Sequence, residues 1–269
     1  MCGRYAASAD PDELIDMFEI DQNAMGEPTR SLLVNPQDPP AGASDYNMAP
    51  SKAAPVVVAR EGVRQLRLLS WGLVPAWAKD ARGGARMINA RAETLLTKPA
   101  YRTAARTRRA LVPAHGWYEW QVSPSATTAA GKPRKQPFFT TRADSAPLAM
   151  AGIYEFWKDP SVGPDDEQTP WVVTFAIITT AAEPGLDRIH DRQPLVLDPQ
   201  QWDRWLDPTL TDGDEIGGFL GPTDPGRFTT WPISSAVNRV ANNGSDLLNE
   251  VPLDQLVGVV DPNTGEVLG

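Results

Sequence analysis

The 269-residue sequence contains very few residues of the kinds that form disulfides, metal clusters or membrane spans. Its one cysteine, Cys2, excludes an intramolecular disulfide framework and a cysteine-rich zinc site. No apolar run approaches the roughly 20 residues needed to cross a bilayer. The N-terminus also lacks a basic segment followed by an apolar stretch, so no secretory signal is visible. We therefore expect a soluble cytoplasmic protein with no membrane contact and no bound metal.

The chain shows no internal repeat and no shift in composition that would divide it into domains. Hydrophobic residues make up 41% and charged residues 22%, which are ordinary values for a globular protein. Many short strand patterns alternate with few helical ones. These patterns predict one α+β domain over residues 1–269, built on a bent antiparallel sheet or open barrel with short flanking helices.

Local patterns place the expected elements along the chain. Asp10 and Pro11 predict a capped helix over 11–18, and Glu61-Gly62 predicts a hairpin between strands 55–59 and 63–71. Further expected elements are strands at 110–113, 116–120, 137–141, 148–157, 171–179, 195–197 and 228–233, and a helix at 200–206. Polar loops or insertions are expected near 21–44, 121–136, 158–170 and 207–226.

Positive charge is concentrated in one segment of an acidic protein. The net charge is −9, which alone argues against a nucleic-acid partner. Residues 82–109, however, contain eight basic residues and one acidic residue, and we expect them to lead into a basic helix ending at Arg109. Such a segment is either a solvated helix face or a limited phosphate-binding track.

The position of Cys2 is chemically distinctive. An initiator methionine is normally removed when the next residue is small, which would leave an N-terminal cysteine. Its amine (pKa about 7.7–8.0) and thiol (about 8.5) are both partly nucleophilic near neutral pH. The pair can condense with an aldehyde to a Schiff base and then close a thiazolidine ring. The alternative is that Cys2 is a buried small hydrophobic residue.

Two further stretches carry unusual residues. Glu119 lies within the aromatic strand 116–120, where burial would raise its pKa and suit it to acid–base chemistry; a surface carboxylate on an edge strand is the alternative. Trp71 opens an aromatic and proline-rich corner that ends at Trp77. This corner is either core packing with a turn or a rigid wedge that stacks on an exposed base.

Six short motifs in this order resemble those of the SOS-response-associated peptidase (SRAP) family, whose members process abasic sites. The motifs are Met1-Cys2-Gly3-Arg4-Tyr5, Tyr46-Asn47-Met48-Ala49-Pro50, Trp71-Gly72-Leu73-Val74-Pro75, Asn89-Ala90-Arg91-Ala92-Glu93-Thr94, Gly116-Trp117-Tyr118-Glu119-Trp120 and His190-Asp191-Arg192. The resemblance implies a single SRAP-like domain.

The resemblance also implies a chemistry. Mature Cys2 would capture the open-chain aldehyde of an abasic site as a covalent thiazolidine, without a cofactor. Glu119 matches the catalytic carboxylate, and His190 matches a histidine that shuttles protons in ring opening or crosslink reversal. Asn89 would hold the Cys2 end by hydrogen bonding. The family name further implies a self-processing peptidase role, and the Schiff base could lead to a lyase reaction.

The implied partner is single-stranded DNA containing abasic sites, including DNA at replication forks. Arg4 and Arg91 would pair with phosphates flanking the lesion, while Pro50 and Trp71 would form a wall that splays the adjacent base. A monomer is expected, associated with the nucleoid when bound to DNA.

One residue departs from the pattern, and three other functions compete with this one. Gln193 stands before Pro194 where the family usually has methionine. The competing functions are an amidohydrolase with an N-terminal cysteine nucleophile, a non-catalytic single-stranded DNA binder, and a zinc site of Cys2, His115 and His190. The zinc site lacks a recognisable ligand spacing.

Overall fold

Five strands close into a barrel in the computed structural model, which describes residues 2–33, 35–146, 148–163, 171–221 and 224–268. Neighbours along the order β5–β4–β7–β10–β11 pair antiparallel, and β11 pairs in parallel with β5 to complete the ring. The barrel strands are β4 (Ala53–Arg60), β5 (Val63–Trp71), β7 (Arg109–Ala114), β10 (Leu148–Lys158) and β11 (Trp171–Ala181). The expected α+β class is confirmed, and the barrel is closed where an open one was one alternative.

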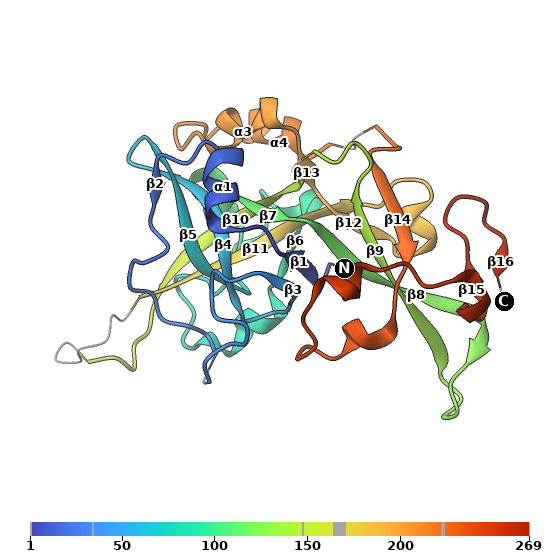
Figure 1. The fold of residues 1–269 in the computed structure, drawn as a ribbon. Coiled ribbons are helices and arrows are strands. Elements are labelled where there is room, and N and C mark those ends of the chain that lie inside the picture. Colours follow the sequence, from blue (N-terminus) through green and yellow to red (C-terminus); the bar gives the residue numbers. More distant parts are fainter. Residues whose placement is uncertain (1, 34, 147, 164–170, 222–223, 269) are drawn as a thin grey trace.

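A second, antiparallel sheet of five strands lies beside the barrel (Figure 1). Its order is β14 (Phe228–Pro232), β9 (Pro133–Arg142), β8 (Gly116–Thr127), β1 (Tyr5–Ala7) and β3 (Asp45–Met48). His115 alone separates β7 of the barrel from β8 of this sheet. The N-terminal end of the chain therefore lies where the barrel and the second sheet meet (Figure 1).

Short elements complete the fold. The remaining strands are β2 (Gln22–Asn23), β6 (Asn89–Arg91), β12 (Arg192–Pro194), β13 (Val196–Leu197), β15 (Val259–Val260) and β16 (Val267–Leu268). The helices are α1 (Pro11–Met17), α2 (Arg102–Thr107), α3 (Pro199–Leu206) and α4 (Gly213–Phe219). The 3₁₀ turns are η1 (Ala81–Arg86), η2 (Ala92–Thr94), η3 (Leu186–Arg188), η4 (Ser235–Asn238), η5 (Ser245–Leu248) and η6 (Leu253–Gln255). Helices α1, α3 and α4 gather at one end of the barrel (Figure 1).

Local sequence explains the start of α1 and the first hairpin. Asp10 and Glu13 form a reciprocal capping box around Pro11, which satisfies two N–H groups at the helix start. Glu61 and Gly62 both have positive φ (56° and 81°), the backbone that a two-residue hairpin turn requires. Both expectations from the sequence are confirmed.

Two of the expected polar loops contain regular structure. Residues 121–136 mostly extend β8 and β9 into a long hairpin, with only residues 128–132 between the strands. They look like a loop in sequence because a hairpin that projects into solvent needs few apolar residues. Within 207–226, Asp212 caps α4 and Ile216 is completely buried, and together these contacts stabilise a helix despite its glycines.

The other two expected loops are only partly described. Described residues of 21–44 form one two-residue strand, β2, and no helix. Lys158 ends β10, while residues 164–170 of the predicted loop lie outside the described residues, as do Met1 and residues 222–223.

Candidate active site around Cys2

Cys2 lies just before β1, the strand that joins β8 on one side and β3 on the other. Its side chain is completely buried, and the thiol donates to the carbonyl of Arg4, with Sγ and O 3.9 Å apart. Burial raises the pKa of the Cys2 thiol, and the negative charge of Glu119 raises it further. In this structure the sulfur is therefore held as a neutral thiol beside a carboxyl group.

Asn89 fixes the backbone of Cys2 from the barrel side. Strand β6 pairs in parallel with β11, opposite Ile177, and this pairing orients the Asn89 side chain. Its Nδ2 donates to the carbonyl oxygen of Cys2 at 2.7 Å. Its Oδ1 is buried and has no hydrogen-bond partner among the described residues. The expected contact between Asn89 and the Cys2 end is present; a role in catalysis stays a prediction.

Glu119 lies in the first half of β8, opposite Phe138 of β9. Only 6% of the residue is exposed, and burial raises the pKa of Glu119 to about 7. A carboxyl group with this pKa is about half protonated near neutral pH, so it can both give and accept a proton. Of the two alternatives that the sequence left open for Glu119, the structure shows the buried one, and the pKa is raised as expected for that case.

His190 approaches the same site from the segment after η3. Its ring is half-buried, and burial lowers the pKa of His190. Nδ1 of His190 lies 3.0 Å from the backbone N–H of Arg192 and 2.9 Å from Oδ1 of Asp191, so it has both a donor and an acceptor within hydrogen-bond distance. His190 and Glu119 line one small cavity, together with Trp117 and Thr140. The fold thus brings together the four predicted catalytic residues from four separate segments, with Cys2 linked to Asn89 by a hydrogen bond and to Glu119 by charge.

Arg192 joins two of the sequence motifs. Its guanidinium binds the Glu93 carboxylate through two contacts of 2.6 and 3.0 Å, and it also donates to the Thr179 carbonyl. This bidentate pair ties the His190 segment to the segment that carries Asn89. Sequence reasoning noted both motifs but did not assign this contact.

The predicted DNA-contacting residues differ in how accessible they are to a ligand. Arg91 is exposed and Pro50 is partly exposed, so both are accessible. Arg4 is partly buried, and its Nη1 donates to Asn47 Oδ1 at 2.6 Å and to the Val237 carbonyl at 2.9 Å. One of its guanidinium nitrogens is therefore already used within the protein.

Trp71 corrects the expectation of an exposed stacking wall. The residue is completely buried, and its Nε1 donates to the Ile88 carbonyl at 2.9 Å. Tyr5 packs edge-on against its ring at 5.0 Å between centroids, and Phe175 stacks at 6.3 Å. Because protein covers the ring, no base can stack on Trp71 in this conformation; it is core packing beneath the site.

The expected basic helix is present as α2, but it ends at Thr107, before Arg109. The rest of the basic segment includes η1, β6 and η2, and Arg109 is 3% exposed. Arg109 Nε donates to the Trp205 carbonyl, and Arg108 pairs with Glu155 at 2.7 Å, so both stabilise the fold. The exposed cations of this segment are Arg82, Arg86, Arg91, Lys98 and Arg102.

Asn47 is a site residue that the sequence did not assign. It is completely buried beside Arg4, and its Nδ2 lies 2.9–3.2 Å from the carbonyls of Val237, Arg239 and Asn242. It therefore attaches η4 and the following loop to β3 and Arg4. Its place in a short motif was the only available indication.

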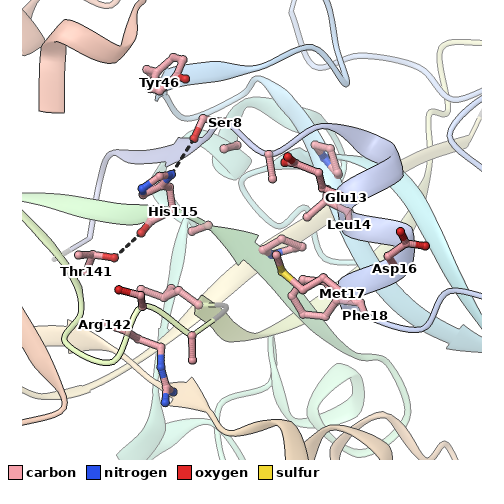
Figure 2. Close-up of a pocket in the computed structure, with 18 residues that line it drawn as sticks. Ser8, Glu13, Leu14, Asp16, Met17, Phe18, Tyr46, His115, Thr141 and Arg142 are labelled. Carbon is pink, nitrogen blue, oxygen red and sulfur yellow. Dashed lines mark hydrogen bonds between the residues drawn. The ribbon is translucent and has the colours of Figure 1, made fainter.

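A cavity of about 950 Å³ lies elsewhere, between α1 and the ends of β7 and β9 (Figure 2). His115 lies between Ser8, whose Oγ is 3.3 Å from Nδ1, and Thr141, which donates to the His115 carbonyl at 2.6 Å. None of the predicted catalytic residues lines this cavity. The described residues contain no histidine, cysteine and carboxylate cluster able to hold a metal ion. No helix in the described parts of the chain is long and apolar enough to span a membrane.

The sequence of this chain matches a known family. The family model for SOS response associated peptidase (SRAP) matches residues 1–240. The chain belongs to the SRAP family. All of the predicted catalytic and DNA-contacting residues lie within this matched region.

Relatives span most of the chain. The abasic site processing protein YoqW of Bacillus subtilis is 34% identical over 92% of this chain and 99% of its own length. YedK of Escherichia coli is 31% identical over 93% and 100%, and mouse HMCES is 28% identical over 96% and 77%. YedK and HMCES are likewise named abasic site processing proteins.

Solved structures share the fold seen here. A Bacteroides thetaiotaomicron protein aligns with a TM-score of 0.69 and 23% identity over 93% of this chain and all of its own. A phage-related protein of Bordetella bronchiseptica aligns with a TM-score of 0.60 and 27% identity, over 86% and 94%.

Proposed function

We propose that this SRAP protein processes abasic sites in single-stranded DNA by capturing them covalently through Cys2. The observation that carries the proposal is the placement of Cys2, held through its carbonyl by Asn89 and lying beside the buried Glu119. The relatives named for abasic site processing support the substrate class. Removal of Met1 is required, because only then does Cys2 carry a free amine.

The reaction is a condensation. The Cys2 amine adds to the C1′ aldehyde of the open sugar, and loss of one water gives an imine. The thiol then adds to the imine carbon, and its proton passes to the nitrogen. The product is a thiazolidine joining protein and DNA, with water as the only by-product and no oxidant required.

The neighbouring groups supply the proton transfers. Protonated Glu119 can protonate the departing hydroxyl, and its carboxylate form can take a proton from the attacking amine. Its pKa of about 7 makes both forms available near neutral pH. His190, which lines the same small cavity as Glu119, can assist opening of the closed sugar ring or reversal of the link. Arg91 and Pro50 are the accessible candidates for contacts with the flanking strand.

The partner, the oligomeric state and the location are further parts of the proposal. We propose a monomer that acts on exposed single strands, including those at replication forks, in the cytoplasm and on the nucleoid. Strand cleavage from the imine and self-processing as a peptidase are further reactions open to the same Cys2 amine and thiol.

A denaturing gel tests the proposal. Purified protein is incubated with single-stranded DNA containing one abasic site, and its intact mass shows whether Met1 is absent. A shifted band that survives denaturation and disappears when the aldehyde is first reduced supports covalent capture. If a correctly trimmed protein gives no shifted band, the proposal is wrong, and the amidohydrolase with an N-terminal cysteine nucleophile takes its place.

A further inference from the structure

Gln193 is a buried polar residue that the proposed chemistry does not use. It lies in β12, and only 3% of the residue is exposed. It lines the small cavity that also contains Glu119 and His190. Because a buried amide needs hydrogen-bond partners inside the protein, its partners show which segment it holds in place.

The Gln193 side chain closes the loop that carries His190. Strands β11 and β12 pair antiparallel, with Thr180 opposite Gln193, and residues 182–191 connect the two strands. Oε1 of Gln193 accepts a hydrogen bond from the backbone N–H of Glu183 at 2.9 Å. This contact joins the two ends of the loop at its base.

Backbone hydrogen bonds lead from this contact to His190. The carbonyl of Glu183 accepts from the N–H of Asp187 at 3.1 Å, within η3. The carbonyl of Leu186, also in η3, accepts from the N–H of His190 at 3.0 Å. Gln193 is thus connected to His190 through Glu183 and η3, so a displacement of Glu183 moves the segment that ends in His190.

Glu183 also connects the loop to the second sheet. Its Oε1 accepts a hydrogen bond from the N–H of Gly226 at 3.0 Å, two residues before β14 begins. Burial raises the pKa of Glu183, and the contacts with Gly226 and Gln193 oppose part of the rise. Because Glu119 belongs to the second sheet and His190 to a loop of the barrel, the Glu183 contacts help to set how these two groups lie relative to each other.

We propose that Gln193 is a positioning residue for His190, which it keeps in the cavity shared with Glu119 by closing the loop 182–191. Without the Gln193 oxygen, the buried N–H of Glu183 has no acceptor, and the base of the loop must open to water to satisfy it. The inference rests on the proposed function for the reaction that His190 serves. The placement of the His190 ring can be measured without any reaction.

NMR of the imidazole rings tests the placement of His190 directly. The sequence contains two histidines, His115 and His190, so His190→Ala assigns both sets of ring resonances. Gln193→Met keeps the length of the side chain but removes the acceptor oxygen. It is expected to shift or broaden the His190 resonances and to leave those of His115 unchanged. Gln200→Met, at an exposed position of α3, is the matched control and should change neither set.

Kinetics test whether Gln193 acts through His190. Gln193→Met is expected to slow whichever step His190→Ala slows, formation or reversal of the crosslink, by about 5- to 50-fold. Its affinity for undamaged single-stranded DNA should stay within about twofold of the wild type, because the variant removes no contact with the strand. In a protein that already carries His190→Ala, Gln193→Met should have almost no further effect, whereas a general loosening of the fold would add to the loss.

A second pair of substitutions keeps the test valid if Gln193→Met does not fold. Gln193→Glu retains an oxygen for the Glu183 N–H but places two carboxylates side by side, so it is expected to slow the same step. Adding Glu183→Gln removes this repulsion and retains an oxygen for the N–H of Gly226. The double variant is expected to recover both the wild-type rate and the wild-type His190 resonances.

The outcomes separate this inference from the proposed function. Unchanged His190 resonances in Gln193→Met, or equal rate losses with and without His190→Ala, would overturn the inference. Failure of the double variant to recover the rate, in a protein with native His115 resonances, would also overturn it. If the wild type forms no crosslink, the proposed chemistry is wrong, and the NMR result alone decides whether Gln193 positions His190.

Discussion

Asn89 and Cys2, 87 residues apart in sequence, are joined by a hydrogen bond of 2.7 Å from Nδ2 of Asn89 to the carbonyl oxygen of Cys2. The bond connects the barrel, through β6, to the segment that leads into the second sheet. It holds the backbone of Cys2, the proposed nucleophile, through the carbonyl oxygen and does not involve the amine or the thiol. The site therefore depends on the junction between the two sheets.

Substitutions of Cys2 test the roles of its amine and its thiol separately. Cys2→Ala is expected to abolish the denaturation-resistant band, because an imine without the thiol hydrolyses. Cys2→Ser retains the terminal amine and is expected to give a band only when borohydride is present to reduce the imine. A stable band from Cys2→Ala without a reductant would show that the link does not use sulfur.

Glu119→Gln should change the pH dependence of stability. Because the folded pKa is raised from 4.5 to about 7, the wild type loses stability as pH rises from about 4.5 through 7, by about 3 kcal/mol. Glutamine does not titrate, so the variant should not show this loss. The free energies of unfolding measured with urea at pH 5 and pH 8 should therefore differ less in the variant than in the wild type. Glu250→Gln, at an exposed position, is the control. An unchanged pH dependence in Glu119→Gln would contradict the raised pKa.

Asn89→Asp tests the contact with Cys2 while keeping the shape of the side chain. The carboxylate cannot donate to the Cys2 carbonyl and repels it, so the nucleophile is displaced. We expect the crosslinking rate to fall about 10- to 100-fold, since small displacements of reacting groups have effects of this size. Asn23→Asp in the exposed strand β2 should react at the wild-type rate. Equal rates for the two variants would show that the hydrogen bond does not position Cys2.

Asn47→Ala should loosen the segment after η4. The change removes the Asn47 hydrogen bonds to the carbonyls of Arg239 and Asn242, while Arg4 Nη1 and the Val237 carbonyl each lose one of two partners and keep their bond to each other. We expect a cost of about 2–4 kcal/mol in unfolding free energy. Hydrogen exchange of residues 237–242 should accelerate more than that of the barrel strands. Asn249→Ala, at an exposed position, should change neither measurement.

Trp71→Ala should act on stability, since Trp71 lies in the core. Loss of its packing against Tyr5 and Phe175 is expected to cost about 3–5 kcal/mol in unfolding free energy. Trp77→Ala should cost no more than about 0.5 kcal/mol, because its ring is in solvent. A stable Trp71→Ala protein that binds DNA weakly would restore the stacking role that the burial of Trp71 excludes.

The sequence by itself determined the local features of this protein. Asp10 and Pro11 fixed the start of α1, and Glu61-Gly62 fixed the first hairpin, whereas the sequence left the burial of Glu119 open between two alternatives. These features depend on neighbouring residues, whose capping, backbone and burial preferences can be read along the chain. The short motifs also identified the family.

Only the tertiary structure decided which surfaces are available. Trp71 and Trp77 have the same side chain, yet their exposure differs. Tyr5 and Phe175 pack against Trp71 and help to bury it, whereas Trp77 is 71% exposed. Arg109 has the charge of a phosphate ligand, but the carbonyl of Trp205, 96 residues away in sequence, binds it inside the fold. Burial and pairing across such separations depend on how the barrel closes, and no local pattern contains that information.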